Sequence, residues 1–466
     1  MKSRYIVEQK YDDNHLLLYS TVTGQFVIIN ETVYKEIVSG SEEHSKHAER
    51  LRQLGFSVDC DEQQLLENNR KKTIQNLNLQ PVTNYVITPT MNCNARCAYC
   101  FESGSHHDDM SMDVAKNVVN FIVTHHKGAP IAIHWFGGEP LMRTDIIDYI
   151  SNELHARNVK FVSKITSNGY LIDKEVLNKA LKKWNVQIIQ ITLDDVEKQY
   201  DAIKQYVDVS SVSPFQRVLG NIELCLKHNL PVRIRINYNP VDIDKVKDIM
   251  CYVLDCFDNH PLLSFHPQAI FSDDETIPGI SGSFSTLHTH PFMRLRQYEQ
   301  ECNARRDKNN PVHAGSTYLK QFIPWCNYRV TANTARPYDK ILKKYYLLPI
   351  PIHCAGICDN SVAIDSHGDI FVCQRLLGQS VEYASGNVVD GIVRNDMYQY
   401  YQSSTLTQKK CHHCVLLPVC QGGCKFKHYK YKTNQGCLPI KGIIRQTVRR
   451  AAEEVEEKYG IERIGE

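Results

Sequence analysis

The sequence has little net charge and no long apolar segment. Its 54 lysines and arginines against 52 aspartates and glutamates leave a formal net charge of +2, with a pI near 7.8. A chain without a broad basic field is not expected to bind nucleic acid. No run of about eighteen apolar residues occurs, and the charged N-terminus has no apolar signal region. We therefore expect a cytoplasmic protein with no membrane partner.

Cysteine, in contrast, is abundant, with 17 among 466 residues. In a long chain with no secretion signal, such cysteines fit metal ligation in a reducing compartment better than disulfides. The chain is too long for one ordinary hydrophobic core, so two or three domains are expected. Hydrophobic residues make up 42% of the sequence, which is enough to form the cores of these domains.

The first cysteine group is Cys93, Cys97 and Cys100, which stand at CxxxCxxC spacing after the apolar segment Tyr85–Ile87. Three close thiolates can hold three irons of a four-iron cluster and leave the fourth iron open to an outside ligand. A structural zinc site would use the same thiolates but would need a fourth ligand nearby.

Apolar runs typical of strands alternate with stretches of helical spacing from residue 84 onward. The expected strands are Val86–Thr88, Ile131–Phe136, Phe161–Thr166, Val186–Thr192 and Val232–Ile236, and the expected helices are Val114–His125, Ile146–Arg157, Lys174–Lys182 and Phe215–Lys227. This alternation predicts an α/β fold with a parallel sheet, closed or part-closed, and a site at the carboxyl ends of the strands. Gly137-Gly138-Glu139 follows the second strand, where glycine lets the backbone approach a ligand and Glu139 offers a carboxylate to an ammonium group.

The cysteine motif, with Tyr99 before its third cysteine, resembles that of the radical S-adenosylmethionine (SAM) superfamily. The resemblance implies a partial (β/α)6 barrel of the TIM type, in which the open iron binds SAM and one electron cleaves it to methionine and a 5'-deoxyadenosyl radical. It also implies that Gly138 and Glu139 contact the methionyl amino group of SAM.

Further matches to this superfamily follow the later strands. Ser167 lies in a polar segment after the third strand, and Thr192 stands where related enzymes place a serine that touches the SAM ribose. Lys204 stands where they commonly have an arginine near the SAM carboxylate. Lysine keeps the positive charge but loses the bidentate fork of arginine.

The C-terminal third contains eight more cysteines, with Gly368 between the second and the third. Eight thiolates would fill two four-iron clusters or two zinc sites. Their spacing resembles the SPASM domain, an auxiliary-cluster module, whereas a zinc ribbon predicts neither the Gly368 spacing nor the upstream motifs. The resemblance implies three [4Fe-4S] clusters in all. It assigns Cys354, Cys358, Cys373 and Cys424 to the first auxiliary cluster, and Cys411, Cys414, Cys420 and Cys437 to the second.

Five segments are expected along the chain. Residues 1–80 form an N-terminal α+β module of three strands and following helices, residues 81–310 the barrel, 311–350 a bridging loop region, 351–440 the SPASM domain and 441–466 a C-terminal helix. The first module is similar to winged-helix modules that bind leader peptides, and a plain structural cap is the alternative. His266, His288, His290 and His313 are interpreted as loop histidines.

The resemblance implies a peptide maturase that abstracts a hydrogen from a ribosomally made precursor peptide and closes a thioether between cysteine and carbon, as in sactipeptide and ranthipeptide maturases. Its partners would be a precursor peptide with its leader and a one-electron donor of the flavodoxin or ferredoxin type. A carbon-to-carbon cross-linker remains an alternative. A formylglycine-forming enzyme of the anaerobic sulfatase-maturing type would need an aspartate where Gln374 stands. A cluster-bearing peptide-binding protein is the alternative that is not an enzyme, and no catalytic acid, base or hydrogen donor is indicated.

Overall fold

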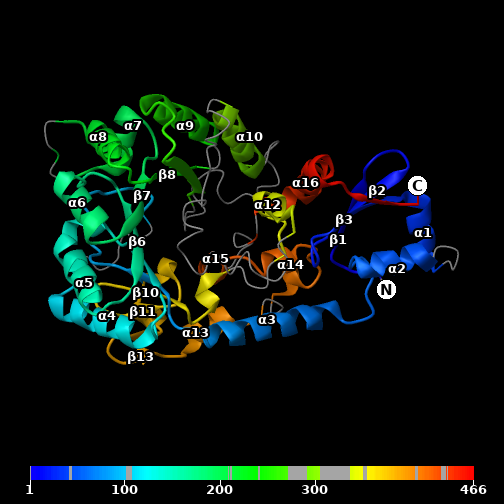
Figure 1. The fold of residues 1–466 in the computed structure, drawn as a ribbon, viewed down its shortest axis with the longest axis horizontal. Coiled ribbons are helices and arrows are strands. Elements are labelled where there is room, and N and C mark those ends of the chain that lie inside the picture. The colour runs from blue at the N-terminus through cyan, green and yellow to red at the C-terminus, as the bar shows by residue number, and fades with distance from the viewer. Residues whose placement is uncertain are drawn as a thin grey trace. The chain divides into compact units, whose positions relative to one another are not determined.

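The computed structural model divides into two units (Figure 1). We call residues 78–327 and 356–401 the barrel unit, and residues 1–77, 328–355 and 402–466 the terminal unit. The structure describes residues 2–40, 45–100, 108–207, 209, 212–239, 242–270, 291–304, 336–349, 354–404, 408–431, 437 and 439–465. Among them, no helix is both long and apolar enough to cross a membrane.

The barrel unit is built on an eight-stranded sheet in the order β11-β10-β4-β5-β6-β7-β8-β9. All neighbouring pairs are parallel except β10 and β11. The strands are β4 (Asn84–Ile87), β5 (Ile131–Trp135), β6 (Phe161–Ser167), β7 (Val186–Thr192), β8 (Val232–Tyr238), β9 (Leu263–Ala269), β10 (Ser361–Ile364) and β11 (Ile370–Phe371). The intervening helices are α4 (Met112–His125), α5 (Thr144–Ala156), α6 (Lys174–Lys182), α7 (Glu197–Lys204), α8 (Pro214–Lys227) and α9 (Asp244–Cys256), and α10 (Pro291–Ala304) follows β9. The predicted α/β class with a parallel sheet is confirmed.

Alternation along the strands gives the sheet two unlike faces. Ile234 and Ile236 of β8 are fully buried in the core that the helices complete, whereas Arg233 and Arg235, which alternate with them, point to the opposite face. Figure 1 shows α4, α5 and α6 along one side of the sheet. The opposite face, with its polar residues, is therefore the one available to a site.

Three strands of this sheet, β9, β10 and β11, were not predicted. Leu263–Ala269 forms β9, so His266 is a strand residue rather than a loop histidine. Ser361–Ile364 forms β10, which pairs with β4 in parallel and brings residues 356–401 into the barrel unit. His288, His290 and His313 lie outside the described residues.

The terminal unit contains a four-stranded sheet in the order β1-β2-β3-β14. Its strands are β1 (Ile6–Lys10), β2 (His15–Ser20), β3 (Phe26–Asn30) and β14 (Glu462–Ile464), and its longer helices are α1 (Glu31–Ser39), α2 (Ser45–Gln53), α3 (Glu62–Asn78) and α16 (Ile444–Tyr459). The three predicted strands are present, and Asn30 accepts hydrogen bonds from two backbone amides of α1, as a capping residue does.

The boundaries of the two units cut across the expected segments. Residues 356–401 group with the barrel because of the pairing of β10 with β4, while residues 402–440 group with the N-terminal module. The C-terminal segment is not helical throughout, since β14 follows α16 and pairs in parallel with β3.

Candidate functional site

Cys93, Cys97 and Cys100 lie in the loop after β4, and all three are partly buried. Burial raises the pKa of Cys93 to about 12, with further contributions from Glu139 and from the other two thiols. Cys97 and Cys100 are thus near enough to Cys93 to disfavour its thiolate. A cationic metal centre supplies the charge that would let such thiols ionise, so the donor set fits the three-thiolate side of a four-iron cluster.

The loop after β5 packs against the backbone just before this cysteine loop. A Cβ atom on Gly138 would lie 2.2 Å from the carbonyl oxygen of Asn92, so a larger residue would force the two loops apart. The amide of Glu139 donates a hydrogen bond of 2.8 Å to the same oxygen. Glycine is thus required here for close approach to the segment that leads into Cys93.

The other side of the cysteine loop is held by the end of α7. The amide of Arg96 donates to the carbonyl oxygen of Lys204 at 2.8 Å, and the amide of Val207 donates to that of Asn94 at 2.8 Å. The final carbonyl of α7, which has no partner within its helix, is satisfied in this way. The cysteine loop is therefore clamped between two segments that follow strands of the sheet.

Glu139 is fully buried and accepts three hydrogen bonds, from the Ser167 hydroxyl at 2.9 Å, the Asn168 amide at 2.7 Å and the Leu141 amide at 3.1 Å. Burial raises the pKa of Glu139 to about 7, and these donors oppose the rise. The Asn168 side-chain amide reaches Cys93 Sγ at 3.9 Å. Two predicted SAM contacts, Glu139 and Ser167, are thus brought together beside the cysteine loop.

Tyr99, Asp194 and Lys204 form a buried polar network. The Lys204 amine lies 2.8 Å from the Asp194 carboxylate and donates to the Tyr99 hydroxyl at 2.9 Å, and that hydroxyl donates to Asp194. Burial opposes the charge on Lys204, but Asp194 above all holds its pKa well above the usual value. The predicted contact of Lys204 with the SAM carboxylate stays a prediction, because its amine is engaged here by Asp194.

The sequence interpretation did not assign a role to Asp194, Asn94 or Asn168. The available signal for Asp194 was its position directly after a predicted strand, where it accompanies Asp195. Thr192, predicted near the SAM ribose, is the last residue of β7 and pairs in register with Arg235 of β8.

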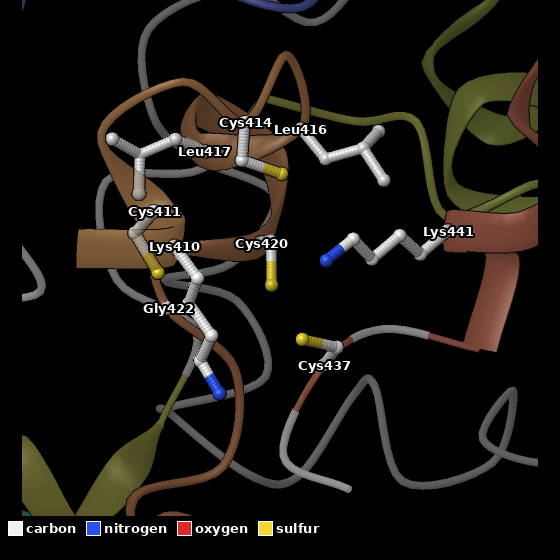
Figure 2. A pocket seen from close by; sticks show the side chains of 9 residues that line it. All are labelled: Lys410, Cys411, Cys414, Leu416, Leu417, Cys420, Gly422, Cys437 and Lys441. Atoms are coloured by element: carbon white, nitrogen blue, oxygen red, sulfur yellow. The ribbon is translucent and has the colours of Figure 1, made fainter. Parts of the chain in front are cut away.

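A second group of thiols lines one pocket in the terminal unit (Figure 2). Its cysteines are Cys411, Cys414, Cys420 and Cys437. Figure 2 shows their sulfur atoms around a common space, with the Lys441 amine directed into it. Burial raises the pKa of Cys411, the thiols of Cys414 and Cys437 raise it further, and two lysines oppose the rise. Four thiols around one space fit a fully ligated cluster.

The described residues contain no group of three or more cysteine, histidine or acidic side chains arranged to hold a single metal ion.

The N-terminal module holds the loop that carries these thiols. The Thr21 hydroxyl donates to the carbonyl oxygen of Val415 at 2.6 Å, and the Gln63 side-chain amide donates to that of His412 at 2.6 Å. Tyr5 packs with Cys411 in a small apolar cluster. At least part of residues 1–80 therefore supports the cysteine pocket, and whether this module binds a leader peptide or caps the main domain stays a prediction.

The remaining predicted cluster ligands divide between the units: Cys354 and Cys424 belong to the terminal unit, Cys358 and Cys373 to the barrel unit. Within the barrel unit, a Cβ on Gly356 would lie 2.6 Å from the Val372 carbonyl oxygen. The segments that carry Cys358 and Cys373 are therefore adjacent. Their ligation of one cluster with Cys354 and Cys424 stays a prediction.

Residues 87–250 match the Radical SAM superfamily. The chain is 30% identical over 151 residues to a GTP 3',8-cyclase of Clostridium perfringens, an alignment that spans 32% of this chain and 44% of that relative. The chain therefore spans less than half of the length of this relative. It is also 20% identical over 498 residues to the radical SAM cyclopropyl synthase TigE of Paramaledivibacter caminithermalis, which spans 96% of this chain and 95% of TigE.

Two solved structures match most of the chain in fold. Native anSMEcpe with bound AdoMet and a Cp18Cys peptide matches with a TM-score of 0.56 at 16% identity, over 81% of this chain and 97% of that one. SuiB of Streptococcus suis bound to its precursor peptide SuiA matches with a TM-score of 0.52 at 18% identity, over 93% of this chain and 97% of that one. These likenesses establish the fold.

Proposed function

We propose that this chain, whose residues 87–250 match the Radical SAM superfamily, modifies a ribosomally made precursor peptide by closing a thioether between a substrate cysteine and a carbon atom. The observation that supports this most is the presence of two groups of thiols. Three cysteines lie at the carboxyl edge of a parallel sheet, and four surround one pocket of the terminal unit. Two neighbours of the same fold are described as holding peptides.

Cys93, Cys97 and Cys100 would hold the SAM-binding [4Fe-4S] cluster. When bound, SAM and this cluster supply the 5'-deoxyadenosyl radical that takes the substrate hydrogen. Gly138 and Glu139 would receive the methionyl amino group. Glu139 suits an ammonium partner because it is buried, and a positive charge there would offset the burial that raises its pKa.

Thioether closure removes two hydrogens from the peptide. One leaves carbon as a hydrogen atom and ends on 5'-deoxyadenosine; the other leaves the thiol as a proton, and one electron is released. That electron needs an acceptor. We assign this task to auxiliary [4Fe-4S] clusters, one held by the four thiols of the pocket in Figure 2 and the other by Cys354, Cys358, Cys373 and Cys424.

A second candidate function is closure of a carbon-to-carbon bond. It is favoured by the match over nearly the whole chain to a relative named a cyclopropyl synthase. Formylglycine formation is disfavoured, because Gln374 follows Cys373 and an amide cannot act as the carboxylate base. In either leading case the partners would be a precursor peptide with its leader and a flavodoxin- or ferredoxin-type donor.

The test is anaerobic incubation of the cluster-reconstituted protein with SAM, a reductant and the cysteine-bearing peptide encoded beside its gene. Mass spectrometry then follows thiol alkylation. We expect a product lighter by two hydrogens that has lost one alkylatable thiol per cross-link. The same mass loss with every thiol still free would establish the carbon-to-carbon candidate instead, and formation of 5'-deoxyadenosine without a changed peptide would contradict both.

Two variants serve as controls in this experiment. Cys97→Ala should yield neither product nor 5'-deoxyadenosine. Cys60→Ala removes an exposed thiol of the terminal unit that is outside both sites and should behave as the unsubstituted protein does.

A further inference from the structure

The four-thiol pocket of the terminal unit also contains positive charge. Lys410 and Lys441 line it together with the four cysteines, and the other described residues of its lining are Leu416, Leu417 and Gly422. Both lysines are exposed, so neither charge has been taken out of water. Among the described residues, the lining of this pocket therefore combines four thiols with two amines and contains no carboxylate.

Lys441 is the lysine that points into the pocket. Figure 2 shows its amine directed into the space that the sulfur atoms surround. The preceding residue, Ile440, is fully buried, which fixes the backbone from which this side chain leaves. Within the part of the chain that the structure describes, Lys441 forms no hydrogen bond or ion pair. Its charge is therefore available to whatever the thiols bind.

The segment that carries Lys441 is attached to the four-stranded sheet. Lys441 lies in a short 3-10 helix, η12 (Pro439–Ile443), which leads directly into α16. Arg449 of α16 donates to the carbonyl oxygen of Lys10 at 3.0 Å and to that of Tyr11 at 2.9 Å. The position of Lys441 beside the thiols is thus set by the fold of the terminal unit.

Lys410, the second amine, is held by a buried histidine. Lys410 Nζ lies 3.4 Å from His428 Nδ1, and His428 Nε2 lies 2.8 Å from the carbonyl oxygen of Gly422. Because a carbonyl oxygen only accepts, Nε2 carries the proton and Nδ1 accepts from the ammonium group. The charges of Lys410 and Lys441 also oppose the rise that burial causes in the pKa of Cys411.

Positive charge at this place matters for electron transfer. A cluster held by four thiolates is an anion, and the electron that thioether closure releases would add another negative charge to it. The reduction potential of an iron–sulfur cluster depends on the net charge around it and on hydrogen bonds to its sulfur atoms. A nearby ammonium group favours the reduced form, whereas it would have no redox effect on zinc, which has no redox chemistry.

We propose that Lys441 raises the reduction potential of the cluster that the four thiols of the pocket would hold, and so suits this cluster to accept the electron released in thioether closure; this rests on the proposed function. Lys441 is in this sense a positioning residue, since it acts through the cluster. Lys410 supplies a second charge of the same sign.

The test is a redox titration of the anaerobic, cluster-reconstituted full chain, with the reduced clusters followed by electron paramagnetic resonance. The spectral component that is missing from Cys420→Ala is assigned to the pocket. Lys441→Gln removes the charge and Lys441→Arg keeps it. Lys46→Gln is the matched control, because Lys46 is exposed on α2 of the same unit and does not line the pocket. Iron and zinc contents are measured on every sample.

We expect Lys441→Gln to lower the ratio of reduced to oxidised pocket cluster, at a fixed solution potential, by about threefold to tenfold, because one positive charge near the solvent boundary is lost. A tenfold change corresponds to about 59 mV for a one-electron couple. Lys441→Arg and Lys46→Gln should stay within about twofold of the unsubstituted protein.

Four outcomes overturn the proposal. An unchanged titration in Lys441→Gln removes the effect, and an equal fall in Lys441→Arg removes charge as its cause. Loss of pocket iron in Lys441→Gln would assign the side chain to cluster assembly. Zinc in place of iron in the pocket of the unsubstituted protein would leave no cluster for Lys441 to act on.

Turnover of the same samples separates this inference from the proposed function. Peptide product per 5'-deoxyadenosine should fall in Lys441→Gln and be kept in Lys441→Arg and Lys46→Gln. A shifted titration with an unchanged product ratio overturns the link to the released electron. If the unsubstituted protein leaves the peptide mass unchanged while Lys441→Gln shifts the titration, the proposed function fails and the effect of Lys441 on the potential stands.

Discussion

At the scale of single residues, the buried pair of Lys204 and Asp194 lies in the polar network beside the cysteine loop. Both side chains are almost completely buried, with exposures of 2% and 1%. Removing one member leaves an uncompensated charge in the interior, which costs far more than the pair itself contributes. The Tyr99 hydroxyl belongs to the same network, and Tyr99 lies in the cysteine loop. Loss of the ion pair is therefore expected to destabilise that loop.

A double-mutant cycle tests this. Asp194→Asn and Lys204→Met should each lower the free energy of unfolding of the barrel unit by about 3–5 kcal/mol, and the double variant should lose much less than the sum. Urea unfolding followed by tryptophan fluorescence is suitable, because all three tryptophans fall within residues 78–327. Strictly additive losses would show that the two side chains are not coupled.

Single residues also mark the limit of prediction from sequence. The cysteine spacing indicates a cluster loop without any knowledge of the fold, since the ligands are close in sequence. The partner of Lys204 could not be predicted, because it depends on how α7 folds back onto β7. Similarly, no pattern in the sequence indicates that Lys425 is only 3% exposed and that its amine donates to the Ser403 carbonyl at 2.9 Å.

At the scale of elements, the approach of the loop after β5 to the cysteine loop sets the position of the first cluster site. Gly138 lies against the Asn92 carbonyl, and Asn92 immediately precedes Cys93. A side chain at position 138 would push against the Asn92 carbonyl and so displace the neighbouring Cys93.

Gly138→Ala should therefore lower the iron bound at the first cluster and abolish SAM cleavage. Iron content after reconstitution and the formation of 5'-deoxyadenosine are the measurements. Gly220→Ala is the matched control: it lies in α8, a Cβ there meets nothing within 4 Å, and alanine favours helix. Normal iron content in Gly138→Ala would mean that the loops can separate without cost.

The elements that sequence predicted best are those with regular apolar patterns. Val186–Thr192 and Lys174–Lys182 have the predicted bounds. By contrast, Pro267 and polar residues interrupt the pattern of β9, and β10 is only four residues long. Its pairing with β4 depends on a contact between segments far apart in sequence, which periodicity cannot indicate.

At the scale of the whole molecule, the two thiol groups belong to different units. Cys93, Cys97 and Cys100 are in the barrel unit, whereas the four thiols of the pocket are in the terminal unit. Each site has its own scaffold, so loss of one need not unfold the other.

Cys97→Ala should abolish SAM cleavage, while Cys420→Ala should keep part of it and lose the modified peptide. The measurements are 5'-deoxyadenosine and peptide product from folded, cluster-reconstituted samples. Equal and complete loss of 5'-deoxyadenosine in both variants would contradict separate roles.

The parallel pairing of β14 with β3 has a consequence for biosynthesis. The sheet of the terminal unit contains strands from both ends of the chain, so its fourth strand is missing until residues 462–464 have left the ribosome. The strands β4 to β9 emerge much earlier and can pair as they appear. The three-thiol loop can therefore be ready for metallation while later residues are still being added, whereas the four-thiol pocket, which the N-terminal module supports, is completed only after Cys437 has emerged.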